Sequence, residues 1–140
     1  MTKDFLYFQF PWQMLMLAIF IQSSIGSLQL PDFGFDLMDK VTHFFVFGIL
    51  AILTARGLRK AKNRLIQEHY LLFTSLMCII YGASDEFHQY FVPGRDSSWG
   101  DLIADTLGVI VLGLVYQVVI NLKELRLKSQ NELNPKYGRE

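Results

Sequence analysis

Long apolar stretches separated by short polar segments dominate this chain of 140 residues. No charged residue occurs between Asp4 and Asp32, and three further charge-free stretches cover residues 41–55, 70–84 and 106–122. A helix needs about 20 apolar residues to cross a bilayer, so the shorter stretches must draw flanking polar residues toward the membrane. The pattern predicts an all-α fold, an integral membrane bundle of four transmembrane helices over residues 5–25, 40–57, 66–89 and 101–122.

Composition supports a membrane protein and excludes several other classes. Hydrophobic residues make up 51% of the chain and charged residues 19%, below the level of about 25% that is typical of soluble domains. Equal numbers of basic and acidic residues argue against an ordinary nucleic-acid-binding protein, and the apolar content excludes a disordered chain. The single cysteine, Cys78, has no intramolecular disulfide partner.

The distribution of charge predicts the orientation. Eleven of the 13 Lys and Arg residues lie at the N-terminus, in the second connection or in the tail, and the exceptions are Lys40 and Arg95. The positive-inside rule then places both termini in the cytoplasm, and most of the acidic residues at the outer ends of the spans. We expect residues 1–122 to form the transmembrane domain, with its first span retained as an anchor, and residues 123–140 to form a fraying polar cytoplasmic tail.

The third predicted span ends in polar residues. Asp85 and Gln89 are four positions apart and share a helix face with Glu86 beside it. Placing a carboxylate within the membrane costs a few kcal/mol unless it faces the bundle or water, and acids oppose the dipole at a helix C-terminus. These residues therefore indicate a functional cluster, with a simple marker of the helix end in the head groups as the alternative.

The loop that follows contains one of the two outer basic residues, Arg95. Pro93 and Gly94 fit the two central positions of a type II turn, which would hold Arg95 near Asp85 or Glu86. The guanidinium would then either pair with an acid or bind a phosphate or carboxylate with two parallel hydrogen bonds.

The second and fourth spans bring further ionisable residues to the same end. Asp101 suits a helix N-terminus, whereas Asp105 lies one turn deeper, where the helix dipole does not explain it. Lys40 either extends to the surface or contacts an anionic head group. His43 enters an apolar run and is a candidate base, nucleophile or metal ligand, with a structural hydrogen-bond donor as the alternative.

Together these residues resemble a known pattern, that of the VanZ-like family, over roughly residues 35–115. The matching positions are Asp39, Lys40 and His43, then Ser84, Asp85, Glu86, Gln89, Phe91, Pro93, Gly94 and Arg95, then Asp101, Asp105 and Gly108. The resemblance implies a small multi-pass protein of the bacterial cytoplasmic membrane and a link to resistance against the glycopeptide teicoplanin. Family members often have Asn where this chain has Asp105, so the cluster here carries an additional negative charge.

Two functional hypotheses follow. In the first, a site at the outer face binds or modifies a lipid-linked or phosphorylated envelope component. Its catalytic candidates are His43, Asp85, Glu86, Gln89 and Arg95, and its ligand-binding candidates are Lys40, Arg95, Asp101 and Asp105. A divalent cation such as Mg²⁺ is a candidate cofactor, held by Asp85, Glu86, Asp101 and Asp105. In the second, the protein is not an enzyme and the polar cluster only holds the bundle together.

Overall fold

The computed structural model describes residues 3–26, 35–95 and 97–133, and within these ranges it contains helices but no strand. A single turn of π-helix, η1, precedes the first α-helix without a break. The elements are η1 (Phe5–Gln9), α1 (Phe10–Ser24), α2 (Phe35–Leu58), α3 (Arg64–Glu68), α4 (Tyr70–Gln89) and α5 (Trp99–Leu133). The all-helical prediction is therefore confirmed for the described part of the chain.

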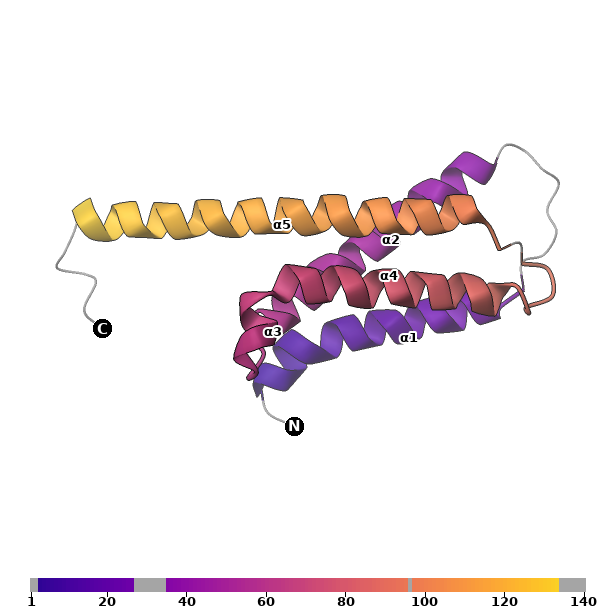
Figure 1. Ribbon diagram of the computed structural model, residues 1–140, viewed down its shortest axis with the longest axis horizontal. Helices are drawn as coiled ribbons and strands as arrows, with labels where there is room; N and C mark the ends of the chain where they lie inside the picture. The colour runs from indigo at the N-terminus through magenta and orange to yellow at the C-terminus, as the bar shows by residue number, and fades with distance from the viewer. Residues whose placement is uncertain (1–2, 27–34, 96, 134–140) are drawn as a thin grey trace.

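The helices run alternately between two ends of the molecule (Figure 1). η1 and α3 lie at one end, while the α4–α5 connection and the start of α2 lie at the other. α1 and α4 run in one direction, and α2 and α5 return in the opposite direction. This arrangement places the end of α4, the start of α5 and the start of α2 at the same end of the bundle.

Three of the described helical segments are long and apolar enough to cross a membrane: Phe5–Ser24, Leu37–Leu58 and Trp99–Leu133. α4 is not among them, so the structure supports three candidate spans and not clearly the four that the sequence predicts. Twenty residues reach about 30 Å along a helix, so the length of α4 suffices. Its apolar character is interrupted by Ser84, Asp85 and Glu86 near its C-terminal end.

Helix boundaries differ from the predicted spans in three places. α2 begins at Phe35, five residues before the predicted start at Lys40. The third predicted span is divided, because Asn63 caps the short helix α3 by accepting a hydrogen bond from the backbone N–H of Leu65 at 2.9 Å, and α4 starts separately. α5 continues as an exposed helix to Leu133, 11 residues beyond the predicted end of the span.

Close packing of α2 against α5 depends on two glycines. A Cβ at Gly108 would lie 2.0 Å from the carbonyl oxygen of Phe44, and a Cβ at Gly48 would lie 2.3 Å from Cδ1 of Leu112. Glycine at such positions allows the backbones of two helices to approach each other in a membrane. α2 and α5 therefore form the most closely packed helix pair of the bundle.

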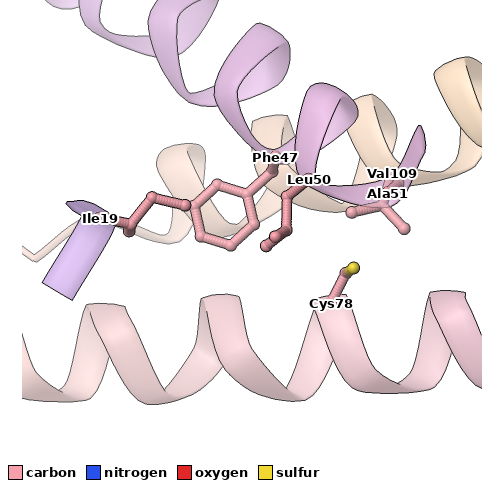
Figure 2. Close-up of a cluster of buried hydrophobic side chains, with 6 residues drawn as sticks. All are labelled: Ile19, Phe47, Leu50, Ala51, Cys78 and Val109. Carbon is pink, nitrogen blue, oxygen red and sulfur yellow. The ribbon is translucent and has the colours of Figure 1, made fainter. Parts of the chain in front are cut away.

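The buried core lies where α1, α2, α4 and α5 meet. Figure 2 shows its members, Ile19, Phe47, Leu50, Ala51, Cys78 and Val109. Large apolar side chains also remain exposed on the outer faces of all four long helices. A chain that buries a small core and exposes apolar side chains on every side is suited to lipid surroundings, in agreement with a multi-pass membrane protein.

Candidate functional site

The buried polar residues gather at the end of the bundle where α4 leads into α5. α4 contributes Asp85, Glu86 and Gln89 from its last two turns, and α5 contributes Asp101 and Asp105 from its first two. All five side chains are buried. Such residues normally remain in water, so their burial together marks this end of the molecule as the candidate site.

His43 on α2 makes the central contact of this site. Its Nδ1 atom lies 3.0 Å from Oδ1 of Asp105, which is 1% exposed. Gly82 of α4 leaves room for this pair, because a Cβ there would lie 3.2 Å from Oδ2 of Asp105. The carboxylate fixes the orientation of the imidazole ring, as acidic partners of functional histidines do.

Glu86 and Asp105 each keep one carboxylate oxygen without a hydrogen bond. Oε2 of Glu86 accepts a bond from the backbone N–H of Ser98 at 3.0 Å. Within the described residues, Oε1 of Glu86 and Oδ2 of Asp105 are buried and have no hydrogen-bond partner. A buried oxygen in this state is costly, so these two atoms are candidates for contact with a ligand.

Asp85 lies on the other face of α4 and has both carboxylate oxygens engaged. Ser23 of α1 donates to Oδ1 at 2.5 Å, and Gln89 donates to Oδ2 at 2.8 Å. One turn earlier on α4, the Tyr81 hydroxyl donates to the carbonyl of Met16 at 2.6 Å. The bonds of Ser23 and Tyr81 attach α1 to α4, and the bond from Gln89 to Asp85 lies within α4.

Arg95 attaches the end of α1 to the α4–α5 loop. The predicted type II turn is confirmed: Gly94 has φ 80°, and the backbone N–H of Arg95 donates to the carbonyl of Val92 at 3.1 Å. The guanidinium donates to two main-chain carbonyls, those of Ile25 at 3.1 Å and Gln22 at 2.6 Å. Among the described residues its recorded partners are therefore these carbonyls and not Asp85 or Glu86.

Lys40 lies beside Asp101 on the α5 side of the site. Its Nζ atom is 3.6 Å from Oδ1 of Asp101, and its side chain is 30% exposed. Lysine and aspartate thus form a partly exposed ion pair near the surface, above the buried contact of His43 with Asp105.

A cavity of about 260 Å³ opens between α1, α2 and α4. Its walls combine apolar residues with polar ones from the same end of the bundle. The apolar lining comprises Leu15, Ala18, Ile19, Val46 and Phe47, and the polar lining comprises Gln22, Ser23, Asp39, Thr42, His43, Asp85, Gln89 and Arg95. Of the residues singled out from the sequence, His43, Asp85, Gln89 and Arg95 therefore share this cavity. Glu86 instead lines a separate hollow together with Phe87, Tyr90 and Trp99.

Two groups of described side chains have the composition and spacing of a metal site. One consists of His43, Glu86 and Asp105, and the other of Asp39, His43 and Asp101. In each group the potential ligand atoms lie within 4.8 Å of one another. Three of the four acids expected from the sequence thus recur, but Asp85 belongs to neither group and His43 belongs to both.

Sequence reasoning did not single out the contribution of α1. The Ser23 hydroxyl donates a hydrogen bond to Asp85, and the carbonyl of Gln22 accepts a hydrogen bond from Arg95. The available signal was the polar triplet formed by Gln22, Ser23 and Ser24 at the end of a long apolar stretch. Polar residues at that point are equally typical of the end of a span, so their partners could not be identified without the structure.

Comparison with known proteins gives a family and a distant relative. The model of the VanZ/LLP1 family matches residues 2–120. A protein of the fission yeast Schizosaccharomyces pombe (strain 972), described as uncharacterized protein C11E3.10, is 31% identical over 129 residues, which cover 87% of this chain and 76% of that protein. No solved structure matches. Since the relative is fungal, similarity of this kind is not confined to bacteria.

Proposed function

This chain belongs to the VanZ/LLP1 family, and on that premise we propose that its polar end binds the phosphorylated head group of a membrane lipid or lipid-linked precursor. The cavity between α1, α2 and α4 supports this proposal. Its apolar wall, which includes Leu15 and Val46, fits a hydrocarbon chain, and its polar wall, which includes His43 and Arg95, fits a head group. Concave sites that combine an apolar lining with a few polar groups are typical of small-molecule binding.

His43 is the residue that we propose acts on the head group. It lines the cavity and is held by Asp105 from the neighbouring helix. A histidine oriented by a carboxylate can accept a proton or attack an electrophilic phosphorus atom. This arrangement supports a modifying enzyme as well as a binding protein, with Asp105 as the residue that positions the ring.

The site faces away from the cytoplasm in this proposal. α4 serves as a fourth span, with its polar C-terminal turns at the outer membrane surface, and the basic α2–α4 connection lies inside. Cysteine labelling tests the orientation in a Cys78→Ala background. Ser97→Cys should react with a membrane-impermeant maleimide on intact cells, and Asn131→Cys should react only after permeabilisation. The opposite result would contradict the orientation.

Lipid binding can be tested by native mass spectrometry with dioleoylphosphatidic acid, using dioleoylphosphatidylcholine as the neutral comparison. We expect selective retention of the phosphatidic acid, and loss of that selectivity in His43→Ala. Ala18→Phe should block the cavity, since Ala18 lines it. Its matched control is Leu17→Phe, because Leu17 is 49% exposed and is not part of the lining. Equal retention by both phenylalanine variants would contradict the cavity as the binding site.

A purely structural role for the polar cluster is the second candidate. It is favoured by the contacts of Asp85, whose two oxygens both accept hydrogen bonds, one from Ser23 of the neighbouring helix α1 and one from Gln89 of α4 itself. The resistance phenotype distinguishes the two functions in a bacterial host. If the ligand is an envelope precursor, expression of this chain in a glycopeptide-susceptible strain will raise the inhibitory concentration of teicoplanin, and His43→Ala at equal abundance will abolish the rise. An undiminished rise with His43→Ala would favour the structural role.

A further inference from the structure

Three side chains from three helices converge at the polar end of the bundle, His43 of α2, Glu86 of α4 and Asp105 of α5, and of these His43 also lines the cavity between α1, α2 and α4. Their potential ligand atoms lie within 4.8 Å of one another. Glu86 is 6% exposed and Asp105 is 1% exposed. Two carboxylates this deeply buried and this close require a proton, a positive partner or water between them.

The hydrogen bonds in the described structure satisfy these carboxylates only in part, since the Ser98 N–H donates to Oε2 of Glu86 and His43 contacts Oδ1 of Asp105. Oε1 of Glu86 and Oδ2 of Asp105 have no hydrogen-bond partner within the described residues. The recorded hydrogen bonds of Arg95 go to main-chain carbonyls, and Lys40 lies beside Asp101. A native protein rarely leaves two buried acceptors in this state, so their position points to a bound species.

We propose that His43, Glu86 and Asp105 bind one divalent transition-metal ion. This group is favoured over Asp39, His43 and Asp101 by burial and by charge. Asp39 is exposed. Oδ1 of Asp101 is also buried without a hydrogen-bond partner within the described residues, but the Lys40 ammonium lies 3.6 Å from that oxygen and offsets its charge. Glu86 and Asp105 are both buried, and each has an oxygen available.

The three potential ligand atoms favour zinc over magnesium. One imidazole nitrogen with two carboxylate oxygens is a ligand set that Zn²⁺ accepts, whereas Mg²⁺ prefers oxygen ligands alone. Donor atoms in tetrahedral zinc sites lie roughly 3.3–3.5 Å apart, and the atoms of this group lie within 4.8 Å of one another, so at most a small side-chain movement is needed to bind the ion. The rotatable bonds of Glu86 permit this movement.

Three protein ligands leave one tetrahedral position open, as in catalytic zinc sites. With zinc bound, His43 would act as a metal ligand in place of a base or nucleophile, and a phosphate oxygen would bind at the open position, since His43 belongs to both the cavity lining and the metal group. The metal would offset the negative charge that otherwise repels a phosphate from this acidic end. In this respect the inference rests on the proposed function, but metal binding itself can be measured without any lipid.

The test uses the full chain, purified in detergent, stripped with a chelator, incubated with Zn²⁺ and desalted. Elemental analysis should find about one zinc ion per chain, and competition with a chromogenic chelator gives the affinity. Glu86→Gln and Asp105→Asn should each weaken binding by at least about tenfold, because each removes a charged ligand. Asp85→Asn is the matched control, since Asp85 is an equally buried acid outside both metal groups, and it should retain the wild-type zinc content.

Equal zinc affinity in wild type, Glu86→Gln and Asp105→Asn would overturn the proposal, as would loss of zinc from Asp85→Asn alone. If either ligand variant fails to fold, the wild-type protein alone tests the proposal. Zn²⁺ must raise the thermal unfolding temperature of the wild type, and an unchanged temperature contradicts the zinc site. Absence of zinc together with selective phosphatidic acid binding would refute the metal and leave the proposed function intact.

Discussion

The polar end of the bundle has two sides that differ in how their buried acids are satisfied. On the side of α1, Asp85 receives hydrogen bonds on both oxygens, from Ser23 and Gln89. On the side of α5, Glu86 and Asp105 each keep one buried oxygen without a partner within the described residues. Both sides contain carboxylates in a mostly apolar bundle, yet the hydrogen-bonding requirement is met on one side and left open on the other.

This difference separates two roles that the sequence presents together. A buried acid whose oxygens all have hydrogen-bond partners, at least one of them on a neighbouring helix, acts as a connector, and its removal should affect stability. A buried acid with an available oxygen reduces stability unless a ligand binds, so its presence indicates a site. We therefore assign Asp85 to the attachment of α1, and His43, Glu86 and Asp105 to ligand chemistry.

The largest expected effect comes from a substitution at the contact between α2 and α5, which holds both sides of the polar end together. Gly108→Ala should prevent α2 from packing on α5, because the new Cβ would lie 2.0 Å from the Phe44 carbonyl oxygen. We expect a loss of more than about 3 kcal/mol in the free energy of unfolding, visible as aggregation in size-exclusion chromatography. Gly113→Ala is the control, since nothing lies within 4 Å of its added Cβ. A stable, monodisperse Gly108→Ala protein would refute this packing.

Asp85→Ala should be the next most damaging change. It leaves the buried amide of Gln89 without its acceptor and breaks the bond from Ser23, at a cost of about 1–3 kcal/mol. In zinc-free buffer Asp105→Asn should change the unfolding free energy by less than about 1 kcal/mol, because it removes a buried charge and keeps an acceptor for His43. Denaturant titration followed by circular dichroism compares the two variants. Equal destabilisation would remove the distinction between the two sides.

Arg95→Lys should loosen the end of α1 nearly as much as Arg95→Ala. The guanidinium reaches the carbonyls of Gln22 and Ile25 together, and a lysine ammonium lacks the planar arrangement of donors that makes this possible. Hydrogen exchange at residues 20–26 should increase in both variants, while exchange in α5 stays unchanged. If residues 20–26 of Arg95→Lys were protected from hydrogen exchange as in the wild type, the positive charge alone would be enough to hold the end of α1.

The smallest expected effect is that of Ser23→Ala. Asp85 would keep its bond from Gln89, so we expect a loss of about 1 kcal/mol and a small decrease in thermal unfolding temperature. Ser84→Ala on α4 is a matched control, because the Ser84 hydroxyl is exposed and donates to the carbonyl of Ile80 within its own helix. A larger loss with Ser84→Ala than with Ser23→Ala would contradict the connecting role of Ser23.

Periodicity and charge predict much of this molecule because they depend on local sequence. They give the helical class, the type II turn at Gly94 and the clustering of acids at one end. They do not identify the hydrogen-bonding partners of these side chains, since the position of a residue on one helix face does not specify which neighbouring helix that face contacts. The sequence therefore did not identify the partner of His43, which the structure shows to be Asp105. It also left Arg95 beside the acids, although its partners are carbonyls of α1.

The most direct test of the central claim measures stability and ligand binding in parallel on Asp105→Asn and Asp85→Asn. Thermal unfolding in zinc-free buffer gives the first quantity, and native mass spectrometry with dioleoylphosphatidic acid gives the second for the folded fraction. We predict that Asp105→Asn unfolds at the wild-type temperature but loses phosphatidic acid binding. Asp85→Asn should unfold at a lower temperature but retain binding. The reverse result, with binding lost in Asp85→Asn and stability lost in Asp105→Asn, would contradict the assignment of the two sides.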